Sequence, residues 1–308
     1  MGPVLLQPRS DCSPLRNQPC KRKQVMTISN IGVLGAGTMG SGIAQVFARQ
    51  GFQVQLVDNQ PSRLQHAVLE IQQSLDKEVA QGPLSATQRD QAAHNIHTAP
   101  QMDRFVDCDL VIEAVSEEEP TKIALFQSLD RICPDSTILA SNTSAISLTR
   151  MAAATNRSDR FMGMHFMNPV AQMDLVELIR ALQTSDATYQ ALHELVQRIQ
   201  KTPVTVKDYP GFVSNRILMP MINEAVYTLY EGVASSTDID AVMKLGMNHP
   251  MGPLELADFI GLDTCLVIMN VLHDGFRDSK YRPCPLLQQM VDAGYYGKKS
   301  GRGFYSYS

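Results

Sequence analysis

The chain has 308 residues, about two domains at roughly 150 residues each, and 44% of the residues are hydrophobic, which is enough for a packed core. Its 27 basic and 31 acidic side chains leave a net charge of −4, a balance that offers no positive surface for nucleic acid or an anionic membrane. No apolar run reaches the roughly 20 residues of a membrane span, and the six cysteines lack metal-ligand spacing. Composition therefore predicts a cytoplasmic protein with reduced thiols and no metal site.

The first 25 residues differ from the rest of the chain. They contain four prolines and a basic cluster at residues 21–23, without a helical or strand period, and this predicts a disordered extension over residues 1–25. We expect the folded chain to begin at Met26. Two interpretations of the extension stay open, a start upstream of Met26 and a mitochondrial transit peptide, and the prolines disfavour the amphipathic helix that a transit peptide needs.

From Ile28 onward, apolar strand patterns alternate with helical ones. Strands are predicted at residues 29–34, 53–57, 109–115, 137–140, 161–165 and 175–179, and helices at 38–50, 61–81, 85–95 and 120–131. Gly82 and Pro83 separate two of these helices, which predicts a helical hairpin over about residues 62–96. The alternation predicts an α/β fold, a Rossmann-type doubly wound parallel sheet with helices on both faces, over residues 26–208.

The pattern becomes entirely helical beyond Pro210. Apolar residues recur at helical spacing from Leu218 to Leu229, and Ser235 is placed to cap a short helix. Pro253 opens a further helix that is predicted to run to about Leu272. These features predict an all-α C-terminal domain over residues 209–308.

A glycine motif lies between the first strand and the first helix. Its six residues match G-x-G-x-x-G: Gly35, Ala36, Gly37, Thr38, Met39 and Gly40. The first glycine permits a tight turn, the second lets the backbone approach a pyrophosphate, and the third allows close packing of helix on strand. Asp58 ends the next strand and would accept hydrogen bonds from the adenosine ribose, although Arg63 nearby would suit a 2′-phosphate. The motif predicts NAD as the cofactor.

Polar side chains cluster at the ends of later strands, where open α/β sheets bind ligands. Residues 141–144 follow one strand, His165 and Asn168 follow another, and Glu177 lies inside an apolar strand, where an unpaired carboxylate is costly. His165 is the expected partner of Glu177. A neutral histidine can take the proton of a secondary alcohol, a carboxylate fixes its tautomer, and hydroxyl or amide donors polarise the substrate oxygen. These residues predict a dehydrogenase.

Several motifs in this order resemble the L-3-hydroxyacyl-CoA dehydrogenase family. They are the glycine motif, Ser141–Ser144, His165–Val170, Pro210–Arg216, Met243–Gly246, Pro250–Pro253, Gly261–Asp263 and Gly297–Tyr305. The resemblance runs from about Ile28 to Tyr307 and is greatest for the bacterial 3-hydroxybutyryl-CoA dehydrogenases, which carry no hydratase region. It implies NAD-dependent, reversible oxidation of a short-chain (S)-3-hydroxyacyl-CoA to the 3-ketoacyl-CoA.

The resemblance also implies roles for individual residues. His165 matches the family's general base and Glu177 its orienting carboxylate, while Ser144, Asn215 and Asn168 match polar groups around the substrate. The matching cofactor-contacting positions are Glu117, Lys122, Asn142, Ser144 and Lys299, and Ser74 matches a coenzyme A contact. The resemblance implies a homodimer through the helical domain. Independently, Asn215 lies seven residues before Ile222 on the buried stripe of its helix, so it needs a polar partner.

Alternatives stay open at this stage. The predicted hairpin holds three basic residues against four acidic ones, so its charge predicts no polyphosphate ligand, and the acyl-CoA substrate is implied by the resemblance alone. One alternative is a dehydrogenase of a free hydroxy acid or sugar acid, as among lambda-crystallin-like relatives, and another is a non-catalytic NAD-binding protein. The β-hydroxyacid dehydrogenases with a catalytic lysine fit less well, because Gly211 stands four residues before Asn215 where they carry that lysine.

Overall fold

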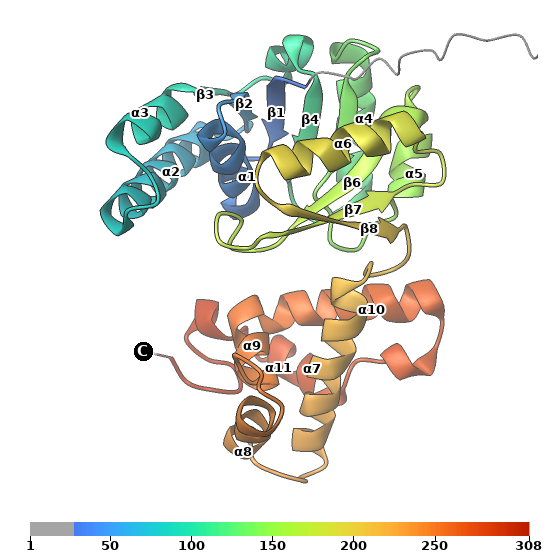
Figure 1. Ribbon diagram of the computed structural model, residues 1–308. Coiled ribbons are helices and arrows are strands. Elements are labelled where there is room, and N and C mark those ends of the chain that lie inside the picture. The colour runs from blue at the N-terminus through green and yellow to red at the C-terminus, as the bar shows by residue number, and fades with distance from the viewer. Residues whose placement is uncertain (1–27, 308) are drawn as a thin grey trace, which may run out of the picture.

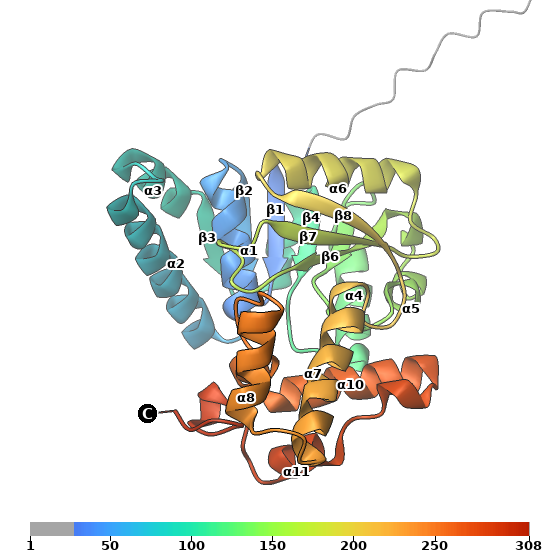
Figure 2. The same ribbon diagram turned by 60° about the horizontal axis from the view of Figure 1, so that its bottom comes forward.

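The computed structural model describes residues 28–307, which form a sheet part and a helical part joined in sequence after the last strand (Figure 1). The predicted extension over residues 1–25 lies outside the described residues, as do Cys12, Cys20 and Met26. Figure 2 shows the same division from another side, with helices α2 and α3 projecting from one flank of the sheet in both views.

The sheet part is built on one eight-stranded sheet in the order β3-β2-β1-β4-β5-β6-β7-β8. The strands are β1 (Asn30–Leu34), β2 (Gln53–Val57), β3 (Ile96–Ala99), β4 (Leu110–Glu113), β5 (Ile138–Ser141), β6 (Phe161–Phe166), β7 (Leu175–Arg180) and β8 (Thr202–Lys207). Its helices are α1 (Thr38–Arg49), α2 (Pro61–Gln81), α3 (Ala86–His94), α4 (Glu119–Ile132), α5 (Leu148–Ala153) and α6 (Asp186–Arg198). The predicted hairpin corresponds to α2 and α3, whose capping box at Ser85 starts the return helix.

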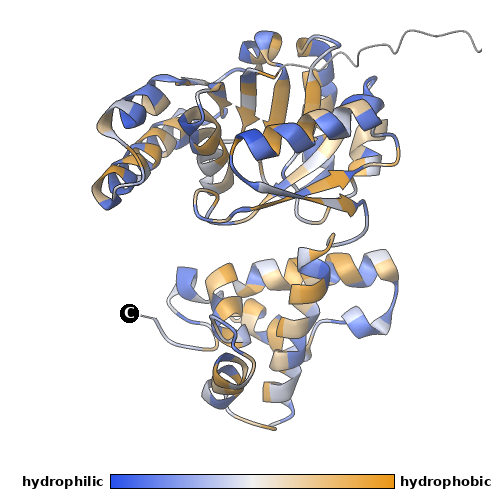
Figure 3. Ribbon diagram, in the orientation of Figure 1, coloured by the Kyte–Doolittle hydropathy of each residue, from blue (hydrophilic) through white to orange (hydrophobic). Residues whose placement is uncertain are grey.

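Two hydrophobic cores cover the two faces of the sheet. Residues of α1, α2 and α6 pack on one face, and residues of α4 and α5 pack on the other. The central strands are buried from end to end, which explains their nearly continuous apolar runs in Figure 3. The predicted fold class, a Rossmann-type sheet followed by a helical domain, is confirmed.

The sheet is not parallel throughout, and this part of the prediction was wrong. Strand β7 pairs antiparallel with β6, and β8 pairs parallel with β7. Only residues 167–174 connect β6 to β7. A parallel connection needs a crossover of about a dozen residues or more, so this short link forces the chain to reverse.

The helical part has its own core and contains α7 (Ser214–Tyr230), α8 (Ser236–Ala241), α9 (Pro253–Ile260), α10 (Leu262–Phe276) and α11 (Pro285–Asp292). The single helix predicted from Pro253 to Leu272 was wrong: α9 and α10 meet at Gly261 with a bend of 98°. Gly261 has a φ of +104°, a conformation that glycine adopts readily, and the apolar pattern continues across it without a break.

Within residues 28–307, five helices and strands were not predicted individually: β3, α5, α6, β8 and α11. Strands β3 and β8 lie at the two edges of the sheet, and their polar residues face solvent, so they lack the apolar run of a buried strand. In the part of the chain that the structure describes, no single helix is long and apolar enough to cross a membrane. Only the sharply bent pair α9 and α10 reaches that length and composition together.

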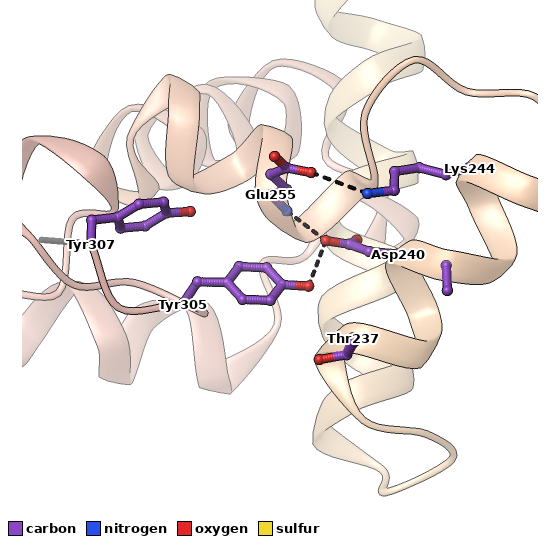
Figure 4. A pocket seen from close by; sticks show the side chains of 7 residues that line it. Thr237, Asp240, Lys244, Glu255, Tyr305 and Tyr307 are labelled. Carbon is purple, nitrogen blue, oxygen red and sulfur yellow. Dashed lines mark hydrogen bonds and ion pairs between the residues drawn. The ribbon is translucent and has the colours of Figure 1, made fainter.

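Two buried carboxylates fasten the C-terminal segment to the helical part. Asp258 accepts hydrogen bonds from Phe304 N and Tyr305 N, at 3.0 and 2.9 Å. Asp240 accepts from the Tyr305 hydroxyl at 2.7 Å and from Glu255 N at 2.9 Å, as the dashed lines in Figure 4 mark. The segment before Tyr305 carries Lys299, so these contacts place that lysine beside α10.

Candidate active site

The glycine motif forms a tight turn into the N-terminus of α1. A Cβ atom on Gly35, whose φ is +106°, would lie 2.6 Å from Ala114 O, and a Cβ on Gly40 would lie 1.8 Å from Gly35 O. A Cβ on Gly37 would meet no atom within 4 Å among residues 28–307. The fold therefore requires glycine at positions 35 and 40, while the space at Gly37 opens on the free N–H groups of α1. This arrangement fits a pyrophosphate.

Asp58 lies next to that turn. Its Oδ2 accepts a hydrogen bond from Ala36 N and its Oδ1 accepts one from Gln60 N, both at 2.9 Å. Each carboxylate oxygen has a second lone pair, so both retain the capacity to accept a ribose hydroxyl. Two backbone N–H groups thus hold the Asp58 carboxylate in place beside the glycine turn.

His165 and Glu177 face each other directly across the β6–β7 pair. His165 Nδ1 lies 2.8 Å from Glu177 Oε2, and both side chains are buried. An N–H donated to the carboxylate from Nδ1 leaves Nε2 as a proton acceptor. Nε2 lies 3.2 Å from the Ser144 hydroxyl oxygen, so the three polar groups form a continuous chain.

Glu177 is held as an anion. Burial by itself raises the pKa of this carboxyl, but the hydrogen bond and charge of His165 and the hydrogen bonds from Ser214 outweigh it. The net effect is a pKa below the usual value for glutamate. A negative charge beside Nδ1 stabilises the imidazolium that forms when Nε2 takes a proton.

A network of charged side chains, with Lys122 and Glu113 buried and Glu117 partly exposed, fixes the loop that carries Ser144. Glu117 accepts hydrogen bonds from Ser144 N at 2.8 Å, from Ala145 N at 3.2 Å and from the Thr143 hydroxyl. Lys122 stands behind it, with Nζ 3.3 Å from Glu117 and 2.5 Å from a carboxylate oxygen of the fully buried Glu113. The lysine thus contacts acidic side chains and lines neither cavity described below.

Asn215 connects the two parts of the molecule at this site. Its Nδ2 donates to Ser144 O at 3.2 Å, which supplies the polar partner that its place on the buried stripe of α7 demands. Asn142 lies on the other side of Ser144, and its Oδ1 accepts from Phe166 N at 2.9 Å. These two amides hold the Ser144 loop against the end of β6.

Two adjoining cavities lie between the carboxyl edge of the sheet and the helical part. One, of about 450 Å³, reaches from Ala114 and Glu117 to Asp263 and Val271. The other, of about 430 Å³, contains Ser144, His165, Asn168, Ser214 and Asn215. They share Met39, Asn142, Ser144, Thr264 and Ile268. The second has an apolar wall made of Met173, Leu218, Met219, Leu256, Phe259, Ile260 and Ile268.

Comparison with known proteins then decides the family. Residues 30–209 match the model of the 3-hydroxyacyl-CoA dehydrogenase NAD binding domain, and residues 211–307 match that of the 3-hydroxyacyl-CoA dehydrogenase C-terminal domain. The chain belongs to the 3-hydroxyacyl-CoA dehydrogenase family. The predicted resemblance, the class of enzyme and the NAD cofactor are confirmed.

Individual relatives of this dehydrogenase agree. It is 54% identical to the probable 3-hydroxybutyryl-CoA dehydrogenase of Bacillus subtilis, over 92% of this chain and 98% of that protein. It is 53% identical to the 3-hydroxybutyryl-CoA dehydrogenase of Bradyrhizobium diazoefficiens, over 91% of this chain and 96% of that protein. The crystal structure of (S)-3-hydroxybutyryl-CoA dehydrogenase from Ralstonia eutropha superposes with a TM-score of 0.89 at 50% identity, covering 92% of this chain and all of that one.

Of the cofactor and substrate contacts that only the family resemblance implied, three lie outside both cavities. Besides Lys122, these are Ser74, a half-buried residue of α2 that accepts a hydrogen bond from Gln45 Nε2 at 2.9 Å, and Lys299, whose Nζ lies 2.7 Å from Asp263 Oδ2. Asp263 lines the first cavity, so the ammonium group of Lys299 lies beside that cavity. Sequence analysis overlooked Ser214 and Thr264, and the place of Ser214 directly before Asn215 was a signal that could have found it.

Proposed function

We propose that this chain catalyses the reversible, NAD-dependent oxidation of a short-chain (S)-3-hydroxyacyl-CoA, such as 3-hydroxybutyryl-CoA, to the 3-ketoacyl-CoA. The continuous chain Ser144–His165–Glu177 at the wall of the second cavity carries this proposal. The activities for which its relatives are named support this substrate class.

The residues take distinct parts in the proposed reaction. His165 Nε2 accepts the proton of the 3-hydroxyl as C3 becomes a carbonyl carbon, and Glu177 keeps the ring oriented and stabilises its positive charge. Ser144 and Asn215 lie around the substrate oxygen, and Asn168 lies at the rim of the same cavity. NAD, when bound, supplies the acceptor for the hydride that leaves C3.

We propose the cofactor positions from the geometry of the first cavity. The glycine turn and the N-terminus of α1 face the pyrophosphate, and Asp58 faces the adenosine ribose. Glu117 and Asn142 border the nicotinamide end, while Lys122 and Lys299 act through Glu117 and Asp263. Ser74 stays a proposed coenzyme A contact on the exposed hairpin.

We also propose a division near residue 208, a homodimer through the helical part, and a cytoplasmic location. The dimer is supported by exposed apolar residues of the helical part, the α8 patch: Val233, Val242, Leu245 and Met247. The location is supported by four free, buried thiols, Cys108, Cys133, Cys265 and Cys284, which suit a reducing compartment.

The decisive experiment follows NADH absorbance with acetoacetyl-CoA and, separately, with free acetoacetate. We expect oxidation of NADH with the thioester only. In His165→Gln, kcat should fall by about 10²–10⁴ while the dissociation constant of NADH stays within a few-fold of wild type. Turnover of free acetoacetate in place of the thioester would support the hydroxy-acid alternative, and NADH binding without any turnover would support the non-catalytic one.

A further inference from the structure

The carboxylate of Glu177 receives more hydrogen bonds than the one from His165. Oε2 accepts from His165 Nδ1 at 2.8 Å and from the Ser214 hydroxyl at 2.9 Å. Oε1 accepts from Ser214 N at 3.0 Å and from Val213 N at 3.2 Å. Three of its four donors therefore belong to the first turn of α7, in the helical part of the molecule.

The start of α7 is shaped to meet this carboxylate. Gly211 and Phe212 precede it with φ values of +71° and +52°, and a bulky residue such as Phe212 rarely adopts the left-handed region. Both residues are buried, so the turn is held by packing and presents Val213 N and Ser214 N to Glu177. The carboxylate takes the place of a helix cap, where the dipole of this 17-residue helix stabilises a negative charge.

The hydroxyl of Ser214 is not needed to begin the helix. The N-cap residue of α7 is Val213, which makes no side-chain hydrogen bond to the first turn of the helix. The hydroxyl instead donates to Oε2, the same oxygen that His165 contacts. The two backbone donors hold Oε1, and Ser214 adds a side-chain donor from the helical part to Oε2.

We propose that Ser214 is a positioning residue for catalysis, acting on His165 through Glu177, so that the proton acceptor is aligned by a chain of three side chains from both parts of the molecule. This inference rests on the proposed function. Without the hydroxyl, Oε1 keeps its two backbone donors but Oε2 keeps only His165, so the acceptor of the imidazole is held less firmly. A misaligned acceptor lowers the rate of the chemical step more than it weakens binding.

The test compares Ser214→Ala with Ser214→Thr in the full-length protein. With acetoacetyl-CoA and NADH, we expect kcat of Ser214→Ala to fall about ten- to hundredfold, the size of one hydrogen bond to a charged group, with the KM for NADH unchanged. Ser214→Thr retains the hydroxyl and should restore most of kcat. Wild-type kcat in Ser214→Ala would overturn the inference.

A spectroscopic readout separates this inference from the proposed function. The His165 Nδ1–H bonded to Glu177 should give a downfield proton resonance in the protein without substrate, and His165→Gln identifies it by its loss. We expect this resonance to move in Ser214→Ala and to return to its wild-type position in Ser214→Thr. A wild-type enzyme inactive on acetoacetyl-CoA would remove the proposed function, while an unmoved resonance would remove the role of Ser214.

Two further variants control for effects of the substitution on the fold. Ser214→Cys keeps the approximate size of the side chain and replaces the hydroxyl with a weak donor. It should therefore lower kcat as Ser214→Ala does, without the loss of packing that alanine causes. Ser185→Ala removes a hydroxyl that accepts from Thr188 N at the start of α6 and lines neither cavity of the site. It should lower Tm without changing kcat or the resonance.

Discussion

The negative charge of Glu177 affects the stability of the protein in a direction that its contacts determine. The pKa of Glu177 lies below its usual value, because the hydrogen bonds from His165 and Ser214 outweigh the opposite effect of burial. Ionised Glu177 therefore stabilises the native protein at neutral pH. This contribution is lost as the pH falls through the lowered pKa.

Glu177→Gln should move the acidic limb of the pH–rate profile for alcohol oxidation to lower pH. Oxidation needs a free lone pair on His165 Nε2, and the neutral amide no longer stabilises the positive charge that a proton places on the ring. The plateau value of kcat should fall as well, since the positive charge that develops on His165 is no longer compensated. Profiles of kcat against pH for both proteins measure this, and a limb that stays in place would contradict it.

Asp58→Asn should reduce the preference for NADH over NADPH. The amide still accepts one backbone hydrogen bond at the turn, but it no longer repels a 2′-phosphate and it binds the ribose hydroxyls less strongly. We expect the ratio of kcat/KM values for the two cofactors to drop about tenfold. A Tm close to that of wild type would show that the turn is intact, and an unchanged ratio would remove the ribose contact.

At the scale of elements, the turn between β1 and α1 contains two kinds of glycine. The fold requires Gly35 and Gly40, whereas Gly37 leaves space for a ligand. Gly40 has no room for a methyl group, because a Cβ there would lie 1.8 Å from Gly35 O. Gly37 has an extended backbone, with a φ of −78° that any residue adopts, and open space where its Cβ would be. The same substitution should therefore have opposite consequences at these positions.

Gly37→Ala should leave Tm nearly unchanged and weaken NADH binding at least tenfold, since its methyl group occupies the space next to the N-terminus of α1. Gly40→Ala should lower the stability by about 1–3 kcal/mol or more through overpacking. Thermal melting and titration of NADH fluorescence measure the two effects. Equal NADH affinity in Gly37→Ala and wild type would place the pyrophosphate elsewhere.

For the whole molecule, the unpartnered apolar surface of the helical part bears on assembly. Leu245, in the α8 patch, is 87% exposed, and so is Leu182 on the sheet part. Two apolar residues close to Leu245 in sequence, Val242 and Met247, are also exposed. An exposed apolar surface of this kind fits the proposed homodimer, in which a second copy of the chain would cover it.

Leu245→Glu should convert the proposed dimer to a monomer, because a buried glutamate at an apolar interface lacks a partner. Leu182→Glu places the same charge at an equally exposed leucine outside the α8 patch and should leave the dimer intact. Sedimentation velocity at several concentrations measures the molar mass of each. A dimer that survives in Leu245→Glu would place the interface away from the α8 patch.

The sequence alone determined those features that depend on neighbouring residues. The glycine turn, strands β1, β2 and β4 to β7, helices α1 and α4, the hairpin and the cap at Ser235 follow from local spacing and side-chain chemistry, and the structure contains all of them. The need of buried Glu177 for a partner was also visible, since one carboxylate inside an apolar strand demands a donor. The family and its cofactor followed from motifs in the right order.

Only the tertiary structure decided how these pieces meet. The link between β6 and β7 is too short for a crossover, so the two strands run antiparallel and His165 faces Glu177. The break at Gly261 turns one apolar pattern into two helices, which close the cavities. The contact of Ser214 with Glu177 joins residues 37 apart in sequence. No local pattern encodes such a contact, because it depends on where α7 docks against the sheet.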